Sequence, residues 1–135
     1  MYMLATCIFR HYSFVFDCGK RLYLLFIKKT YGENHPEYAF SLNNLAALHH
    51  KAGNYGKAIL ILQKLLEIRK NFDGNNSINF ANSLNTLANL YKWEGEYVKA
   101  LPLFQQALEI TKKILGENHP SYARSLNSLA ELYDF

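Results

Sequence analysis

Asparagine stands at one position of three related phrases in this sequence, and its side chain is suited to contacting another polypeptide. Asn43, Asn85 and Asn127 each follow a Ser-Leu pair. An amide both donates and accepts hydrogen bonds, so it can pair with the main chain of an extended peptide. Asparagine is a poor helix former, and its recurrence in helical sequence therefore needs a reason. A second interpretation stays open, in which these amides bond to one another or to the neighbouring helix and join adjacent repeats.

Further polar and basic side chains lie on the same helical stripe as these asparagines. The basic ones, Lys51, Lys92 and Arg124, could attract an acidic peptide, although exposed basic residues are more often a solvated face. Trp93 could anchor a ligand, although an aromatic side chain near a helix end more often packs on the next repeat. The candidate peptide-binding residues are Asn43, Asn44, Lys51, Asn82, Asn85, Asn89, Lys92, Arg124 and Asn127.

The sequence contains no pattern that indicates catalysis, a cofactor or a metal. The adjacent His49 and His50 point to different faces of a helix, which is unsuited to ligating one metal ion. No nucleophile–base arrangement and no glycine-rich phosphate loop is found, because the glycines are placed as helix stops. We therefore expect a protein that is not an enzyme and that needs no cofactor.

Length, composition and charge are those of one ordinary soluble domain. The chain has 135 residues, of which 50% are hydrophobic and 19% charged. The net charge of +4 is too small and too dispersed to indicate nucleic-acid binding, but it mildly favours acidic partners. The two cysteines, Cys7 and Cys18, suggest no disulfide framework. Charged residues interrupt the apolar first 27 residues, so we expect no membrane span, no export signal and a cytoplasmic location.

The asparagine phrase belongs to a repeat of 42 residues, and each repeat carries the spacing of two helices. Leu42, Leu45 and Ala46 fall on one helical stripe, and Gly53 and Gly95 are placed to end the first helix of each pair. A second apolar stripe follows at once in each repeat. The pattern predicts a partial helix near 20–30 and helices near 36–52, 55–71, 78–94, 97–114 and 120–135.

Each predicted helix pair has an apolar face that only the next pair can cover, which indicates an all-α solenoid of about two and a half repeats. The units lie near 36–77, 78–119 and 120–135, within an array over 20–135, and residues 1–19 form an irregular N-terminal segment without assignment. The sequence stops within a first helix. We therefore expect a slice of a longer array, or a piece that self-associates through uncapped ends.

The pattern of the second repeat resembles the tetratricopeptide repeat signature. The residues that carry it are Leu87, Ala88, Tyr91, Gly95, Tyr97, Ala100, Phe104, Ala107 and Leu108. The 42-residue period, the linker Leu-Gly-Glu-Asn-His-Pro and the phrase Ser-Leu-Asn-Asn-Leu-Ala resemble the kinesin light chain type of this repeat. The resemblance covers residues 20–135. Two departures, His49 for tyrosine and Leu65 for alanine, are expected to loosen the first unit without threatening the fold.

The resemblance implies peptide binding on a concave face built mainly from the first helix of each pair. Kinesin light chains bind short acidic segments that contain tryptophan, which favours a peptide-contacting role for the asparagines. We expect a protein-interaction scaffold for short peptide segments, acidic ones among them, that binds neither nucleic acid nor membrane. The alternatives are a structural or assembly element, or an accessory array of a larger signalling enzyme.

Overall fold

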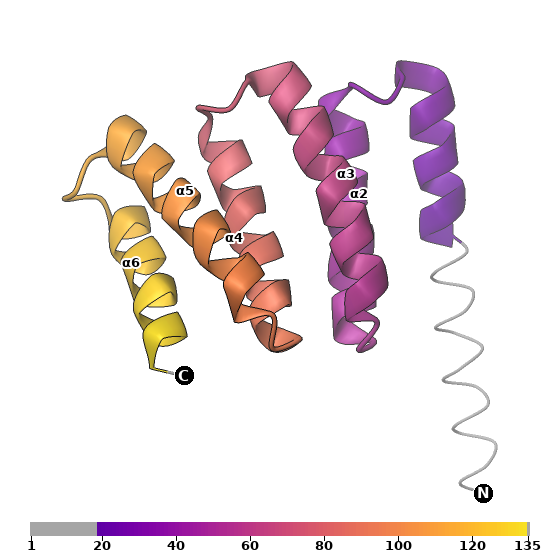
Figure 1. Ribbon diagram of the computed structural model, residues 1–135. Helices are drawn as coiled ribbons and strands as arrows, with labels where there is room; N and C mark the ends of the chain where they lie inside the picture. Colours follow the sequence, from indigo (N-terminus) through magenta and orange to yellow (C-terminus); the bar gives the residue numbers. More distant parts are fainter. Residues whose placement is uncertain (1–18, 135) are drawn as a thin grey trace, which may run out of the picture.

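The computed structural model describes residues 19–134, and over that range it consists of helices joined by short turns. Residues 19–31 are helical, and we call them the N-terminal helical segment. The helices that follow are α2 (Pro36–Lys51), α3 (Tyr55–Asp73), α4 (Ile78–Trp93), α5 (Tyr97–Leu115) and α6 (Pro120–Tyr133). Each packs on its neighbour in the chain (Figure 1). The result is the expected all-α solenoid.

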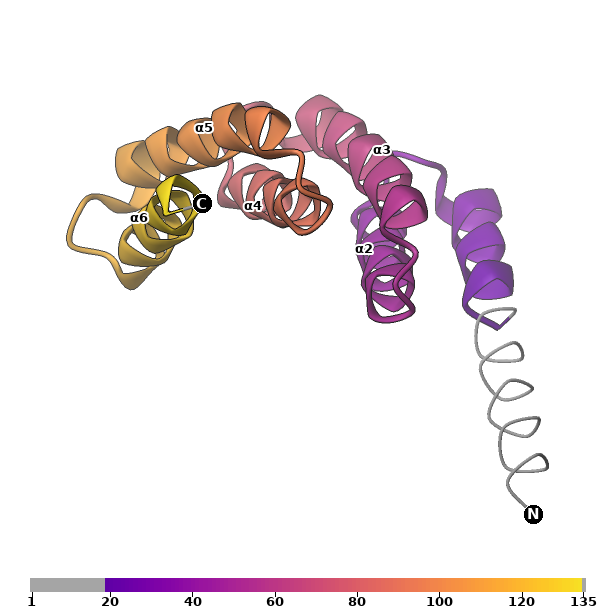
Figure 2. The ribbon, with the colours of Figure 1, turned by 60° about the horizontal axis from the view of Figure 1, so that its bottom comes forward.

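The helices are arranged as an arc with an inner and an outer layer. Figure 2 shows α2, α4 and α6 on the inner side of the arc and α3 and α5 on its outer side. Because the first helix of each pair is inside, the recurring asparagine phrase lies in the inner layer. We call this inner side the concave face. It is the surface on which any site built from the repeated phrase must form.

The observed helices agree with the predicted ones except at their ends. α3 and α5 run slightly beyond their predicted ends, to Asp73 and Leu115. Helical structure at Gly19 replaces the irregular backbone expected there, and the rest of the expected segment, 1–18, lies outside the described residues. The division of the array into units near 36–77, 78–119 and 120–135 stays a prediction.

Side chains cap the first helix of each repeat. Ser77 Oγ accepts a hydrogen bond from the backbone N–H three residues on, at 3.0 Å, as expected for a serine N-cap. His35 and His119 do the same through Nδ1, which accepts from the N–H two residues on at 3.2 and 3.1 Å. Pro36 and Pro120 follow in the first turn, where the missing N–H costs nothing. The Asn-His-Pro phrase is therefore a helix start.

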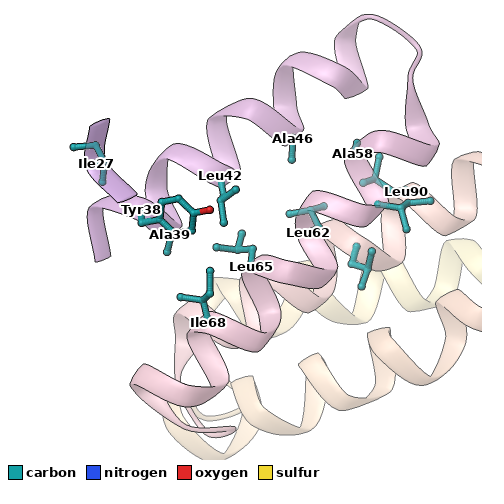
Figure 3. Close-up of a cluster of buried hydrophobic side chains, with 12 residues drawn as sticks. Ile27, Tyr38, Ala39, Leu42, Ala46, Ala58, Leu62, Leu65, Ile68 and Leu90 are labelled. Atoms are coloured by element: carbon teal, nitrogen blue, oxygen red, sulfur yellow. The ribbon is translucent and has the colours of Figure 1, made fainter. Parts of the chain in front are cut away.

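The largest core cluster crosses from the first repeat into the second. One cluster runs from Ile27 of the N-terminal helical segment, through Leu42 and Leu65, to Leu90 of α4 (Figure 3). Alanines at the helix crossings allow close approach, and they are Ala46, Ala58, Ala88 and Ala100. Leu65, which departs from the repeat pattern that the sequence resembles, is nevertheless fully buried. The array thus accommodates this departure within its core.

Two glycine substitutions test the proposed helix stops. Gly95 has a φ of 81°, which a side chain disfavours, although a Cβ there would meet open space. Gly95→Ala is expected to lower the free energy of unfolding by about 1–2 kcal/mol. Gly56 is the control, because it lies inside α3 and has no positive φ. Gly56→Ala is expected to raise the same quantity by about 0.5 kcal/mol. Urea denaturation measures both free energies of unfolding. Equal changes in the two variants would contradict the assignment of Gly95 as a helix stop.

Candidate functional site

The concave face contains a hollow of about 450 Å³ between α2 and α4, which we call the α2/α4 hollow. Apolar side chains from three helices, among them Ala46, Leu62 and Leu90, form much of its wall. Polar groups border them, and the full lining comprises Asn43, Ala46, Ala47, His50, Leu62, Thr86, Asn89, Leu90, Lys92, Trp93 and Glu131. An apolar wall with a few polar groups is the usual composition of a site for one side chain or a small ligand.

A second hollow of about 430 Å³ lies between α4 and α6, and we call it the α4/α6 hollow. Its lining is mostly polar and comprises Ile78, Asn82, Asn85, Thr86, Thr111, Leu115, Ser121, Arg124, Ser125 and Ser128. Thr86 lines both hollows, so the two are neighbours on one face. Hydroxyl and amide groups in this density offer hydrogen bonds to a peptide main chain.

The structure divides the nine predicted site residues among three places. Asn43, Asn89 and Lys92 line the α2/α4 hollow, and Asn82, Asn85 and Arg124 line the α4/α6 hollow. The other three line neither hollow: Asn44, Lys51 and Asn127. Asn44 and Lys51 are exposed on α2. Six of the predicted residues therefore meet at two adjacent hollows.

The three equivalent asparagines have different environments. Asn85 Nδ2 donates to Ser125 Oγ at 3.3 Å, which joins α4 to α6. Asn85 Oδ1 is buried and accepts no hydrogen bond. Asn127 Nδ2 donates within its own helix to Glu131 Oε1 at 3.3 Å, and Asn43 is exposed. Joining of repeats thus occurs at Asn85, whose buried oxygen is left without a hydrogen-bond donor.

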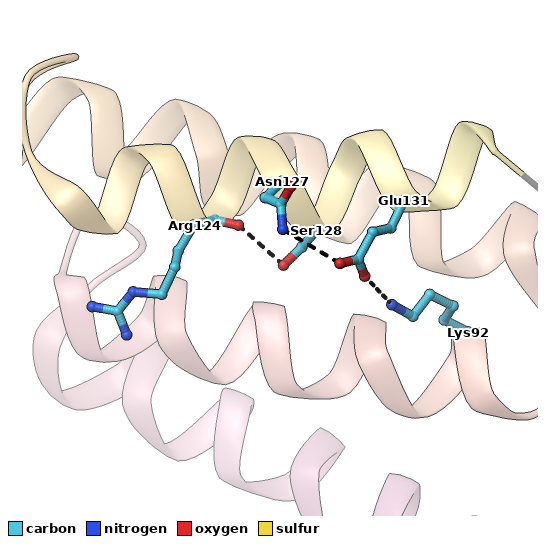
Figure 4. A network of polar contacts seen from close by, with 5 residues as sticks. All are labelled: Lys92, Arg124, Asn127, Ser128 and Glu131. Carbon is cyan, nitrogen blue, oxygen red and sulfur yellow. Dashed lines mark hydrogen bonds and ion pairs between the residues drawn. The ribbon is translucent and has the colours of Figure 1, made fainter.

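The basic residues on this face differ in whether they are already paired. Lys92 Nζ lies 3.0 Å from Glu131 Oε2, and its side chain is only 15% exposed. The same carboxylate accepts from Asn127, so the three residues form one network (Figure 4). Arg124 is exposed and its guanidinium points away from this network (Figure 4). Within residues 19–134 no carboxylate forms an ion pair with Arg124.

Trp93 is an exposed aromatic at the rim of the α2/α4 hollow. Its side chain is 62% exposed. The more common role of an aromatic residue near a helix end, packing on the next repeat, would have buried it. Its ring meets the edge of the His50 ring, with centroids 6.1 Å apart. An exposed indole beside an apolar hollow is a suitable surface for stacking or anchoring.

The sequence places Glu131 on the same stripe as the candidate residues, but it was not among the nine predicted binding residues. It follows Asn89 by one repeat period of 42 residues and lies on the recurring stripe, so its place on the concave face was readable. Its pairing with Lys92 was not, because the two are 39 residues apart and belong to different helices. That pairing depends on how α4 and α6 are aligned.

No group of three or more His, Cys, Asp or Glu side chains within residues 19–134 could hold a metal ion. In the same range, no helix combines the length and the apolar character that crossing a membrane requires.

Comparison with known families assigns the fold. The family model for the tetratricopeptide repeat matches residues 17–71 and 79–135. The chain belongs to the tetratricopeptide repeat family. No curated protein is significantly similar to this tetratricopeptide repeat protein in sequence.

Solved structures give the repeat type. BtubC (BKLC) from P. vanneervenii superposes with a TM-score of 0.80 at 22% identity, over 87% of this chain and 47% of that chain. A Podosopora anserina chain assigned as a kinesin light chain, with nearly identical TPR-like repeats, superposes with a TM-score of 0.77 at 25% identity. The match covers 84% of this chain and 54% of that chain. The tetratricopeptide repeats of this chain are thus of the kinesin light chain type, and the chain spans about half the length of those two.

The family also sets the broad function. Tetratricopeptide repeats indicate a scaffold for contacts between proteins.

Proposed function

We propose that the concave face binds a short extended peptide segment, with a preference for acidic sequences. The observation that carries the proposal is the pair of adjacent hollows on α2, α4 and α6, which share Thr86. A peptide running across the inner helices would meet an apolar hollow and then a polar one. Such alternation of pockets is how extended peptides are read by side chain.

The two hollows would take different parts of the ligand. The apolar wall of the α2/α4 hollow and the exposed Trp93 suit a large apolar or aromatic side chain. In the α4/α6 hollow, the exposed Arg124 forms no ion pair with a carboxylate among the described residues. An acidic side chain of the ligand would supply one.

We propose a cytoplasmic site of action as well. The two cysteines, Cys7 and Cys18, fit a compartment in which thiols stay reduced, since the sequence shows no disulfide framework.

Arg124→Gln tests the acidic preference directly. Fluorescence polarisation of a labelled acidic peptide with one tryptophan is expected to give saturable binding to the unmodified chain. Arg124→Gln should weaken that binding about threefold to tenfold, because a charge-assisted hydrogen bond is lost. Lys113→Gln is the matched control, since Lys113 is an exposed cation on α5, in the outer layer. Absence of binding to the folded parent, or an equal loss in the control, would contradict the proposal.

A further inference from the structure

Glu131 lines the α2/α4 hollow, and both of its carboxylate oxygens are paired although its side chain is 52% exposed. Its two carboxylate oxygens have separate partners: Oε2 lies 3.0 Å from Lys92 Nζ, and Oε1 accepts from Asn127 Nδ2 at 3.3 Å. Two restraints on one planar group fix its position more tightly than either alone. The negative charge of Glu131 therefore lies beside the α2/α4 hollow.

Lys92 is more enclosed than the lysines of the other ion pairs. Its side chain is 15% exposed, whereas those of Lys28, Lys99 and Lys112 are about half exposed. The ammonium group therefore has little open surface, and Glu131 occupies one of its directions of approach. An acidic ligand that reached Lys92 would have to displace Glu131 or tolerate its like charge, and either costs affinity.

Arg124 presents the opposite situation one hollow away. It is exposed, lines the α4/α6 hollow and has no carboxylate partner within the described range. A ligand carboxylate can approach its guanidinium without displacing a protein group, which leaves the full charge available. Arg124 is thus open to a ligand carboxylate, whereas Lys92 is already paired with Glu131.

We propose that Glu131 is a built-in competitor for acidic ligands at Lys92, and that it sets where the negative charge of a bound peptide can lie. This inference rests on the proposed function. It assigns a neutral ligand side chain to the α2/α4 hollow and the acidic one to the α4/α6 hollow. Glu131 is accordingly a specificity-determining residue that acts by occupying a cation.

Removing the charge of Glu131 tests the competition. In Glu131→Gln, the acidic tryptophan peptide is expected to bind about twofold to fivefold more tightly than to the unmodified chain. A neutral peptide with Asn and Gln in place of each Asp and Glu should change less than about twofold, because it gains no ion pair. Glu117→Gln is the control: it removes an equal charge, from a carboxylate 2.9 Å from Lys112 Nζ in the α5–α6 connection.

A double substitution distinguishes two effects of Glu131: its pairing with Lys92, and its general repulsion of an acidic peptide. With Lys92→Met as the starting chain, Glu131→Gln should strengthen acidic binding far less, because no cation is released. An undiminished effect there would overturn the inference, as would unchanged or weaker acidic binding in Glu131→Gln alone.

The two proposals fail in distinguishable ways. If the unmodified chain binds the peptide and Glu131→Gln binds it no better, only the competition is wrong. If no folded variant binds either peptide, the proposed function is wrong and the competition for peptides falls with it. Circular dichroism of each variant establishes that it is folded before binding is compared.

Discussion

Replacing Phe104 by alanine is expected to lower the free energy of unfolding by about 3–5 kcal/mol. Phe104 is 0% exposed and packs in one cluster with Ala88, Ala100 and Leu132, from three helices. Truncation leaves a cavity at the junction of α4, α5 and α6, because the alanines around it are too small to fill the space. In a repeat array each unit is stabilised by its neighbours, so α6 should lose its packing surface as well.

Urea denaturation followed by circular dichroism measures this loss. Phe40→Ala is the matched control, since Phe40 on α2 is 59% exposed and the same atoms are removed. It should change the free energy of unfolding by no more than about 0.5 kcal/mol. A loss below about 1 kcal/mol for Phe104→Ala would contradict the assignment of this residue to the core of the second repeat.

Replacing Leu62 by alanine is expected to cost about 2–5 kcal/mol and also to alter the groove. Leu62 is 0% exposed, belongs to the cluster that joins α2, α3 and α4, and lines the α2/α4 hollow. Its removal would deepen the hollow from below. The affinity for a peptide with a large apolar side chain should fall, because the helices that form the wall of the hollow lose a packing contact beneath it.

A leucine in the same helix provides the control. Leu60 is 66% exposed, and Leu60→Ala should leave the free energy of unfolding within about 0.5 kcal/mol of that of the unmodified chain. Thermal or urea denaturation of the two variants, with peptide polarisation on the folded fractions, measures both effects. Similar stabilities for Leu62→Ala and Leu60→Ala would rule out the proposed floor of the hollow.

The fold was predictable because local and long-range signals agree. The helical spacing of Leu42, Leu45 and Ala46 recurs with a fixed period, and glycines with positive φ, such as Gly53, end the helices. The sequence did not reveal helix capping by a residue that rarely serves as a cap. Histidine is not among the preferred N-caps, so the capping role of His35 could not be read from the sequence.

The candidate site was predictable in position but not in detail. The stripe that contains Asn43, Asn85 and Asn127 does lie in the inner layer, because periodicity fixes which face of a helix is buried. Their separate bonds depend on neighbours: Asn85 has α6 beside it, whereas Asn127 bonds within its own helix. The Lys92–Glu131 pair likewise depends on the alignment of two helices, which no single-helix spacing encodes.

The most direct test of the groove uses the single tryptophan of the chain. Trp93 gives one indole N–H signal in a nitrogen-15 correlation spectrum, so it needs no assignment, and an unlabelled acidic peptide adds no signal. Titration should shift this signal and the side-chain amide signals of Asn82, Asn85 and Asn89. It should leave those of Gln105 and Gln106, exposed on α5 in the outer layer, unchanged. Shifts confined to the outer layer, with the Trp93 indole unmoved, would contradict a peptide site on the concave face.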